Sequence, residues 1–362
     1  MAMESPRRRK APLTLAVGFK FSHHNDDAGY DELKFYLLPS IDYLDLSWIF
    51  RLRHHASSHL MRALGALLVL LADIYILLIS RRYDVIHFLY VENFPVFSGW
   101  LLSKLGAARV VYSHHLDPER CPVGLLTSKR LWREVLLKAS AHVCLTTDQV
   151  KRLQSSQPGL KRVTCIPHGM HAFPAPQAED VQRRFHSDYV LIAGSNYRDF
   201  SLIKEFAERL ASLGLRLEVV GGGSWVAGAE PLPGNMVIHG RLDYDAYNAV
   251  FDRAFALCLP LTYASANNAL LESFAIGLPC LISEGATEGI DYILPELRVP
   301  HHAKGFADKV QALREGSAEA YFSLAQAHWA LGRDRCGWPY VSSQLLALYG
   351  ELSSERIRDA YP

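Results

Sequence analysis

Short apolar runs alternate with stretches of helical periodicity along almost the whole chain, and this alternation constrains the fold more than any other feature. In the first half the apolar runs cover residues 13–19, 41–47, 84–90, 108–113, 141–147 and 163–166. They are rich in β-branched and aromatic residues, and helical stretches of about 10–15 residues separate most of them. Short strands that alternate with helices are typical of a parallel sheet built from βαβ units. The sequence therefore predicts an α/β protein.

The same alternation starts again in the second half, which indicates two domains. The second set of runs covers residues 189–193, 215–220, 236–238, 255–259 and 280–283. Residues 171–180 are rich in proline and alanine, so we expect an extended linker and a boundary near 170–188. A chain of 362 residues has the length of two ordinary domains.

We expect two doubly wound, Rossmann-like domains that face a central cleft, at residues 1–170 and 188–335. Three helical stretches follow the last strand, at about 303–315, 317–331 and 339–352. The C-terminal helix, at about 339–362, is expected to pack back on the first domain. Ligands of doubly wound domains bind beyond the carboxyl ends of the strands, so any site should lie at those edges.

Charge is distributed unevenly between the two halves. Residues 1–165 hold 22 Lys and Arg against 14 Asp and Glu, whereas the remainder holds 16 against 23. A basic first half suits an anionic partner, either a lipid surface or a phosphorylated acceptor. The alternative is that this difference in charge is random variation among solvated surface residues and has no function. No basic cluster is interleaved with aromatic residues, so nucleic acid is not an expected partner.

Targeting features are weak. No secretory signal is visible near the start. The six cysteines form no CxxC pair, so we expect buried free thiols in a reducing compartment. Residues 63–80 are long enough to approach a membrane span, but Asp73 near the middle would cost roughly 2.5–3.5 kcal/mol there. We interpret this stretch as a buried or interfacial helix. The expected location is cytoplasmic, with contact to the inner membrane face left open.

The stretch from Asn267 to Ile282 is the most informative part of the chain. Asn267 or Asn268 can cap the N-terminus of a helix, whose early turns then contain Glu272. Gly277 ends the helix and Pro279 prevents its continuation. A small, polar loop that leads into a helix N-terminus can bind a diphosphate. The alternative is an ordinary helix cap with a solvated Glu272.

This stretch, Asn268-Ala-Leu-Leu-Glu-Ser-Phe-Ala-Ile-Gly-Leu-Pro-Cys-Leu-Ile, resembles the signature of GT-B glycosyltransferases, in particular the large retaining family four. Further similar passages occur in the expected order, at residues 84–87, 110–115, 163–169, 190–199, 218–223 and 237–241. The resemblance covers roughly residues 84–310. It implies transfer of a sugar from a nucleotide-activated donor, with retention at the anomeric carbon and without a metal. Glu272 would then bind the donor ribose.

Two departures from the family pattern concern the donor sugar and the acceptor. The signature usually has a second glutamate eight positions before the last one, and that position is Ala264 here. The family often has a Gly-Gly loop after its first strand, whereas Gly29 is the only glycine in the loop at 22–31. The predicted acceptor-binding residues are His24, Gly29, Tyr30 and His114.

Arg198 follows the strand at 189–193, where a guanidinium can bind a diphosphate and stabilise the leaving group. The alternative is a surface pair between Arg198 and Asp199, and Lys204 is a weaker candidate for the same role. The predicted donor-binding residues are Gly194, Arg198, Gly222, Gly223, His239, Asn267, Asn268, Leu270 and Glu272. The glycines at 221–223 do not predict a dinucleotide site, because they lack GxGxxG spacing and because Pro231, Pro233 and Gly234 intervene before any helix can follow.

His115 ends the strand at 108–113 and matches the acceptor-side histidine of the family. His115 and Arg198 are the predicted catalytic residues. The imidazole of His115 can orient hydroxyl groups or move a proton near neutral pH. A structural role for His114 and His115 is the alternative. A metal site formed by residues 23–27 and 114–119 would lack the usual ligand spacing, so no metal is expected.

The sequence thus predicts a glycosyltransferase whose co-substrate is a nucleoside-diphosphate sugar, such as a UDP-sugar, and no other cofactor is expected. The base and the sugar of this donor stay open. The acceptor is a lipid-linked molecule, a polysaccharide or a small molecule. One alternative is an epimerase or hydrolase of nucleotide sugars, for which Asp117 and Glu119 are candidate acid–base groups. Another is an inactive partner subunit, which the alanine at position 264 keeps open.

Overall fold

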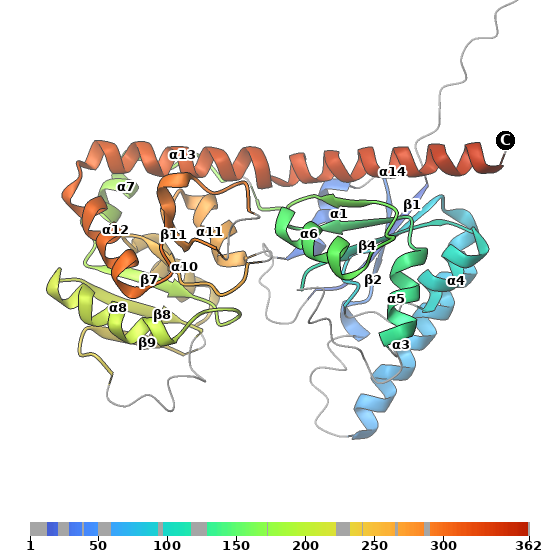
Figure 1. Cartoon of the computed structure of the whole chain (residues 1–362), viewed down its shortest axis with the longest axis horizontal. Coiled ribbons are helices and arrows are strands. Elements are labelled where there is room, and N and C mark those ends of the chain that lie inside the picture. The colour runs from blue at the N-terminus through green and yellow to red at the C-terminus, as the bar shows by residue number, and fades with distance from the viewer. Residues whose placement is uncertain are drawn as a thin grey trace, which may run out of the picture. The chain divides into compact units, whose positions relative to one another are not determined.

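The computed structural model describes residues 13–20, 29–37, 40–49, 59–92, 97–116, 129–171, 173–221, 232–240, 242–264, 267–285 and 290–360. The chain divides into two compact units. Unit 1 contains residues 1–145, 149–166 and 341–362, and unit 2 contains residues 146–148 and 167–340. Each unit is built around one parallel sheet with helices on both faces (Figure 1).

Unit 1 has a six-stranded sheet in the order β2-β1-β3-β4-β5-β6. Its strands are β1 (Thr14–Gly18), β2 (Asp42–Asp45), β3 (Val85–Phe88), β4 (Arg109–His114), β5 (Ala141–Cys144) and β6 (Val163–Cys165). Its helices are α1 (Leu33–Leu37), α3 (His59–Ile79), α4 (Phe97–Leu105), α5 (Lys129–Lys138) and α6 (Thr147–Ser156). Short 3-10 turns, η1 (Tyr30–Glu32) and η2 (Ser80–Arg82), precede α1 and follow α3.

Unit 2 repeats this design, with the strand order β12-β11-β10-β7-β8-β9. Its strands are β7 (Tyr189–Ala193), β8 (Arg216–Val220), β9 (Met236–His239), β10 (Leu257–Leu259), β11 (Cys280–Ser283) and β12 (Arg298–Val299). Its helices are α7 (Ala178–Phe185), α8 (Ser201–Ser212), α10 (Tyr244–Arg253), α11 (Asn268–Ile276), α12 (Ala303–Glu315) and α13 (Ala318–Cys336), with η4 (Pro295–Leu297) before β12. All strand pairs in both sheets are parallel, which confirms the predicted fold class.

The apolar strands of unit 2 are explained by two cores, one on each face of its sheet. Leu191 points to the core that α11 covers, whereas its neighbours Val190 and Ile192 point to the core that α8 and α12 cover. Successive side chains of a strand point to opposite faces, and a sheet covered on both faces therefore has no polar side. This is why the predicted strands read as continuous apolar runs rather than as alternating patterns.

The last helix, α14 (Trp338–Ala360), begins in unit 2 and continues into unit 1. Gly337 separates α13 from α14, between the helical stretches that the sequence predicts at about 317–331 and 339–352. A Cβ atom at Gly169 would lie 1.9 Å from the ring of Trp338, so this position requires glycine. Within unit 1, the Tyr349 hydroxyl of α14 lies 2.7 Å from Nδ1 of His87 on β3.

The expected extended linker between the halves is wrong in part, because residues 178–185 form helix α7. Val181 is buried in the core beside α8, and Glu179 and Asp180 lie in the first turn, where the helix dipole favours acidic groups. Proline and alanine content had indicated extended structure throughout 171–180. The helix depends instead on tertiary contacts of residues that follow the last proline.

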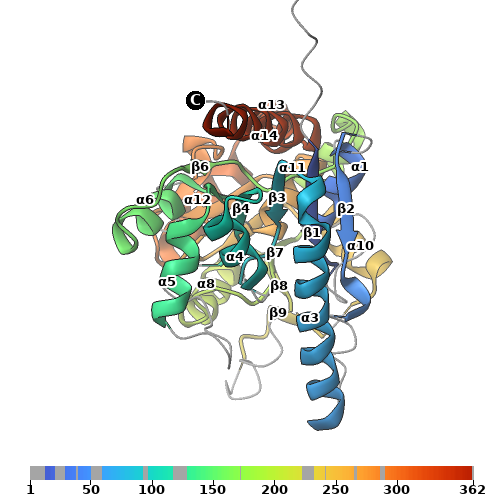
Figure 2. The ribbon, with the colours of Figure 1, turned by 90° about the vertical axis from the view of Figure 1, so that its right-hand side faces the viewer.

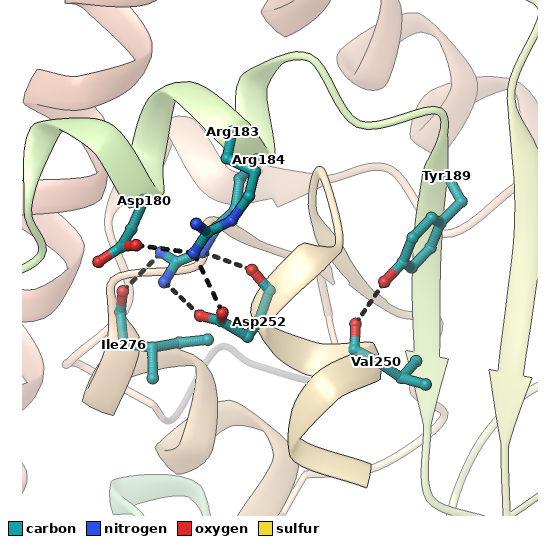
Figure 3. A network of polar contacts seen from close by, with 7 residues as sticks. All are labelled: Asp180, Arg183, Arg184, Tyr189, Val250, Asp252 and Ile276. Atoms are coloured by element: carbon teal, nitrogen blue, oxygen red, sulfur yellow. Dashed lines mark hydrogen bonds and ion pairs between the residues drawn. The ribbon is translucent and has the colours of Figure 1, made fainter. Parts of the chain in front are cut away.

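Arg184 of α7 holds the C-terminal ends of two other helices (Figure 3). Its guanidinium donates from Nη1 to the carbonyl oxygen of Ile276 at 2.7 Å and from Nε to that of Asp252 at 3.1 Å. Nη2 also lies 3.0 Å from Oδ1 of Asp252. The last carbonyl groups of a helix have no partner within the helix, so this buried side chain satisfies groups of α10 and α11 at once.

Five cysteines lie in the described residues, and all are free thiols. Cys144, Cys258, Cys280 and Cys336 are buried and Cys165 is half-buried, as the apolar context of most of them predicts. Cys121 lies outside the described residues.

Candidate functional site

The candidate donor site lies at the switch point of the unit 2 sheet. Strand β7 pairs with β10 on one side and with β8 on the other, so the chain changes direction along the sheet between β10 and β7. The helices that follow these two strands, α8 and α11, cover opposite faces. Such a point presents the carboxyl ends of two strands without a helix crossing between them, and ligands bind there in doubly wound folds.

Two loops at this point are joined by backbone hydrogen bonds. Asp199 donates to the carbonyl of Pro260 at 2.7 Å, and Thr262 donates to that of Tyr197 at 2.9 Å. Tyr197 has a φ of 59°, which is unusual for a residue with a side chain. The loop after β7 is therefore held against the loop after β10 in a defined conformation.

Arg198 lies between the end of β7 and the beginning of α11. Its Nε donates to the carbonyl of Ala193 at 3.0 Å, its Nη1 to that of Asn196 at 2.7 Å, and its Nη2 lies 3.4 Å from Oδ1 of Asn267. Burial lowers the pKa of this guanidinium to about 10, so Arg198 remains charged at neutral pH. The alternative pair with Asp199 does not form, because that carboxylate accepts from Ser201 and contacts His301 at 3.0 Å.

Gly194, directly after β7, leaves the space that Arg198 occupies. A Cβ atom at this position would lie 2.8 Å from Nη2 of Arg198, and the φ of 81° itself favours glycine. Gly221, at the end of β8, also has a positive φ of 86°, and its Cβ position lies 3.4 Å from the Cα atom of Gly194. Neighbouring strand ends thus lack side chains where a ligand could approach the backbone.

Helix α11 begins and ends as the sequence predicts. Asn267 is the N-cap, and its Oδ1 accepts from the N–H of Leu270 at 3.4 Å. Gly277 ends the helix with a φ of 66° in the left-handed region. The first N–H groups of a helix have no acceptors within it and carry the positive end of the dipole, so this terminus can bind an anion.

Glu272 is half-buried, unlike the solvated carboxylate of the alternative interpretation. The Tyr247 hydroxyl of α10 donates to its Oε2 at 2.6 Å. Burial raises the pKa of Glu272, while the bond from Tyr247 and the charge of Arg198 act in the opposite direction. The structure therefore brings Arg198 and Glu272 into one electrostatic group with Tyr247, which sequence reasoning missed because only the fold places α10 beside α11.

The remaining donor-side predictions occupy different environments. His239 ends β9, half-buried, with Nε2 at 2.9 Å from Glu218 on β8. Asn268 and Leu270 lie in the first turn of α11, with Leu270 buried in the core. Lys204 is exposed on α8. Gly222 and Gly223 lie outside the described residues.

Ala264 is fully buried and packs in the same core as α11. The structure thus has a small apolar side chain where the family signature usually has its first glutamate. Residue 264 therefore provides no carboxylate that could contact a donor sugar.

Unit 1 has its own switch point, between β1 and β3, where aromatic side chains gather. The ring of His115 lies 4.8 Å from that of Tyr30 and 4.5 Å from that of Tyr90. Its Nε2 lies 2.8 Å from the carbonyl oxygen of Leu89, which can only accept, so Nε2 carries a proton. Tyr30 is buried directly after Gly29, which has a φ of 116°.

His114 differs from His115 because its side chain belongs to the core. Its Nε2 lies 3.0 Å from Nδ1 of His142, and His142 in turn contacts the carbonyl of Leu136 at 3.0 Å. Burial lowers the pKa of His114 well below its ordinary value, and the neighbouring His142 and His115 act in the same direction. His114 is thus a neutral member of a buried pair. His24 lies outside the described residues, as do Asp117, Glu119 and residues 23, 26 and 27 of the considered metal site.

Two carboxyl groups near the unit 1 switch point were not predicted. Glu92 accepts from the N–H groups of His115 at 2.5 Å and Leu116 at 2.9 Å, and burial raises its pKa to about 7.

Asp31 is the second of these carboxyl groups. It is 1% exposed, and burial raises its pKa to about 6. Neither oxygen of Asp31 has a hydrogen-bond partner in the part of the chain that the structure describes, and Nζ of Lys34 lies 3.9 Å away. The sequence offers no signal for either group, since both depend on strand order.

We expect Glu92 to make the stability of the protein fall between pH 5 and 8. Its pKa in the folded state, about 7, exceeds the ordinary value of 4.5, so the folded state binds the extra proton in this range. The contribution is fully present below pH 4.5 and is lost as pH rises through 7. Replacing Glu92 with glutamine should flatten this dependence, by on the order of 1–3 kcal/mol over the range.

Urea unfolding at pH 5, 6, 7 and 8 measures this effect. Glu134→Gln, at an exposed position of α5, is the matched control and should keep the wild-type pH dependence. Equal slopes for the wild type and Glu92→Gln would contradict the assignment of this titration to Glu92.

Two features define the class of fold: parallel doubly wound sheets in both units, and in unit 2 a helix N-terminus beside the half-buried Arg198. These are the features of GT-B glycosyltransferase structures. Residues 190–315, which lie within unit 2, match the family model of the group 1 glycosyl transferases. No curated protein matches the sequence.

Solved structures of the same fold cover almost the whole chain. Sucrose-phosphate synthase from Thermosynechococcus elongatus has a TM-score of 0.66 at 14% identity, covering 95% of this chain and 100% of its own. A glycosyltransferase from Rickettsia africae has a TM-score of 0.63 at 14% identity, covering 95% and 99%. HepE from Anabaena, in complex with UDP and glucose, has a TM-score of 0.61 at 12% identity, covering 94% and 100%. At these identities the likeness shows the GT-B fold, and membership of family four in particular stays a prediction.

Proposed function

We propose that the protein is a glycosyltransferase that takes its sugar from a nucleoside-diphosphate donor bound to unit 2. The observation that carries this proposal is the convergence of Arg198, Asn267 and Glu272 at the N-terminus of α11. A cation and a helix N-terminus suit a diphosphate, while a half-buried carboxylate suits the hydroxyl groups of a ribose. The group 1 match over residues 190–315 covers all three residues.

The chemistry of this site follows from where negative charge develops. As the bond between the anomeric carbon and the diphosphate breaks, charge accumulates on the leaving phosphate oxygens. Arg198 and the N–H groups of α11 would stabilise that charge from fixed positions, and such preorganised electrostatics usually contributes most to catalysis. Retention at the anomeric carbon is part of the proposal, on the strength of the family resemblance.

The acceptor would bind to unit 1, near the switch point of its sheet. His115, with Nε2 donating to Leu89, is held in one orientation by two aromatic rings, and Glu92 fixes the backbone that carries it. We propose His115 as the residue that orients or deprotonates an acceptor hydroxyl. Asp31, buried and without a hydrogen-bond partner in the described residues, is a second group that could receive a hydroxyl of the acceptor.

Nucleotide binding tests the donor site directly. We expect one diphosphate among UDP, GDP, ADP, CDP and dTDP to raise the melting temperature of the purified protein, with UDP first in line because HepE was crystallised with it. A ligand at about 100 times its Kd stabilises the folded state by about 2.7 kcal/mol, which thermal unfolding detects easily. If none stabilises the protein, the alternative of an inactive partner subunit with the same fold becomes the better proposal.

Replacing Glu272 with glutamine should weaken nucleotide binding by about tenfold, because the ribose loses a charged acceptor. Tyr247→Phe should have a smaller effect in the same direction, since it removes the hydroxyl that holds Oε2. Glu208→Gln, exposed on α8, is the matched control. Calorimetric titration with the stabilising nucleotide measures all three, and unchanged affinity in Glu272→Gln would place the ribose elsewhere.

A nucleotide-sugar epimerase or hydrolase is the second candidate, favoured by the raised pKa values of Glu92 and Asp31. Carboxyl groups that exchange protons near neutral pH suit acid–base catalysis. Turnover of the donor sugar without any acceptor would support this candidate, whereas dependence of turnover on an added acceptor would support transfer.

A further inference from the structure

Helix α3 in unit 1 exposes an apolar face that the proposed function does not use. By length and composition, Ala63–Arg82 is the one described segment that could cross a membrane. Eight large apolar side chains of α3 are between 41% and 77% exposed: Leu60, Leu64, Leu67, Leu70, Leu71, Ile74, Tyr75 and Leu78. A soluble surface helix normally carries polar residues on the face that points away from the core.

The opposite face of α3 is packed against the rest of unit 1. Val69, Ala72 and Ile76 are buried, and so is Asp73. The Asp73 carboxylate accepts from the N–H of Ser98 on α4 at 3.0 Å, and also from the hydroxyl of that serine. Asp73, which argued against a membrane role in the sequence, therefore lies on the inner face. The outward face between residues 63 and 80 has no charged side chain.

The width of the apolar face indicates what covers it. At about 100° per residue, the eight exposed apolar side chains span an arc of about 140° around the helix axis. A partner helix needs a narrower stripe, whereas lipid contacts every side of a helix that protein does not cover. With its 21 residues, α3 presents a face about 30 Å long, and its N-terminal turns extend beyond the sheet of unit 1 (Figure 2).

Helix α4 and the C-terminal end of α3 carry residues of the kinds that occupy the membrane interface. Helix α4, which packs on α3, carries Phe97 at 49% exposure, and Nζ of Lys104 lies 5.0 Å from the ring of Trp100. Arg81 and Arg82 are exposed at the C-terminal end of α3. Tryptophan and basic side chains are enriched where acyl chains meet head groups, and the basic residues complement anionic lipids.

We propose that unit 1 binds a bilayer containing anionic lipids through the exposed face of α3, which lies in the interface and does not cross the membrane. The inner face of α3 is bound to protein, so the helix is available to lipid on one side only. Apolar side chains on that side would enter the acyl region by about 5–10 Å, and Arg81, Arg82 and Lys104 would meet the head groups. This proposal is independent of the glycosyltransferase activity.

Vesicle flotation of the purified full chain tests it, with phosphatidylcholine vesicles that contain either none or 30 mol % phosphatidylglycerol. We expect binding to the anionic vesicles that weakens as salt is raised. Leu67→Glu combined with Leu71→Glu should reduce the bound fraction at least tenfold, because two charges enter the apolar face. Leu232→Glu, at an exposed leucine of unit 2, is the matched control and should bind like the wild type. Arg81→Gln with Arg82→Gln should lose about fivefold per arginine on anionic vesicles only.

Two outcomes would overturn the proposal. One is equal flotation of the wild type and the double glutamate variant, with both folded by circular dichroism. The other is a wild type that binds neither vesicle but sediments as a dimer that Leu67→Glu with Leu71→Glu converts into a monomer. In that case the face of α3 is an interface between two copies of the chain.

Discussion

Arg198→Ala should raise the Kd of the bound nucleoside diphosphate by about 10–100-fold and lower donor turnover by about 100–1000-fold. The guanidinium lies beside the N-cap of α11, with Nη2 at 3.4 Å from Oδ1 of Asn267, where a diphosphate is expected. A hydrogen bond to a charged group contributes about 1.5–3 kcal/mol to binding. Removing a donor that stabilises charge in the transition state costs about 2.7–4 kcal/mol. Turnover should therefore fall further than affinity.

Isothermal calorimetry and a nucleotide-release assay measure the two quantities. Arg198→Lys keeps the charge but loses the fork, so it should recover affinity better than turnover. Arg209→Ala is the matched control, because the side chain of Arg209 on α8 is 41% exposed and pairs only with Glu205 among the described residues. Arg198 also donates to the carbonyls of Ala193 and Asn196, so the melting temperature of each variant must be compared. A folded Arg198→Ala with near wild-type affinity and turnover would exclude this residue from the donor site.

Arg184→Ala should lower the free energy of unfolding by about 3 kcal/mol, the largest stability effect we expect from an arginine of unit 2. The substitution leaves two carbonyl oxygens, those of Asp252 and Ile276, without their donors at the ends of α10 and α11 (Figure 3). A buried acceptor left unsatisfied costs about 1–3 kcal/mol, and these two half-buried carbonyls should lie in the lower part of that range. Since α11 carries the candidate donor site at its other end, nucleotide affinity should fall as well.

The neighbouring residue provides the control for this prediction. The side chain of Arg183 is 54% exposed and bonds to Asp180 at 2.7 Å and to Asp252 at 3.4 Å. Exposed ion pairs contribute at most about 1 kcal/mol, so Arg183→Ala should change the unfolding midpoint only slightly. Urea denaturation compares the two variants, and equal destabilisation would show that helix-end carbonyls do not depend on Arg184.

Elements with strong local signals were predictable. The alternation of apolar runs and helices, its restart near residue 189 and the cap residues Asn267 and Gly277 all have counterparts in the structure. Each depends on the properties of neighbouring residues, such as side-chain period, cap geometry or the conformational freedom of glycine. Where local signals conflicted with distant packing, as in α7, the prediction was wrong.

The features of the candidate site likewise divide into those that local sequence determines and those that depend on the tertiary structure. The sequence by itself determined that Asn267 or Asn268 caps a helix, that Glu272 lies in its early turns and that Arg198 follows a strand, because short-range periodicity and capping decide these features. Only the tertiary structure decided that Tyr247 donates to Glu272, that Asp199 pairs with His301 and that Asp73 turns away from the exposed face of α3. These partners are 25, 102 and 25 residues apart in the chain. Their contacts depend on strand order and on which face each helix covers, and neither is encoded in the residues next to them.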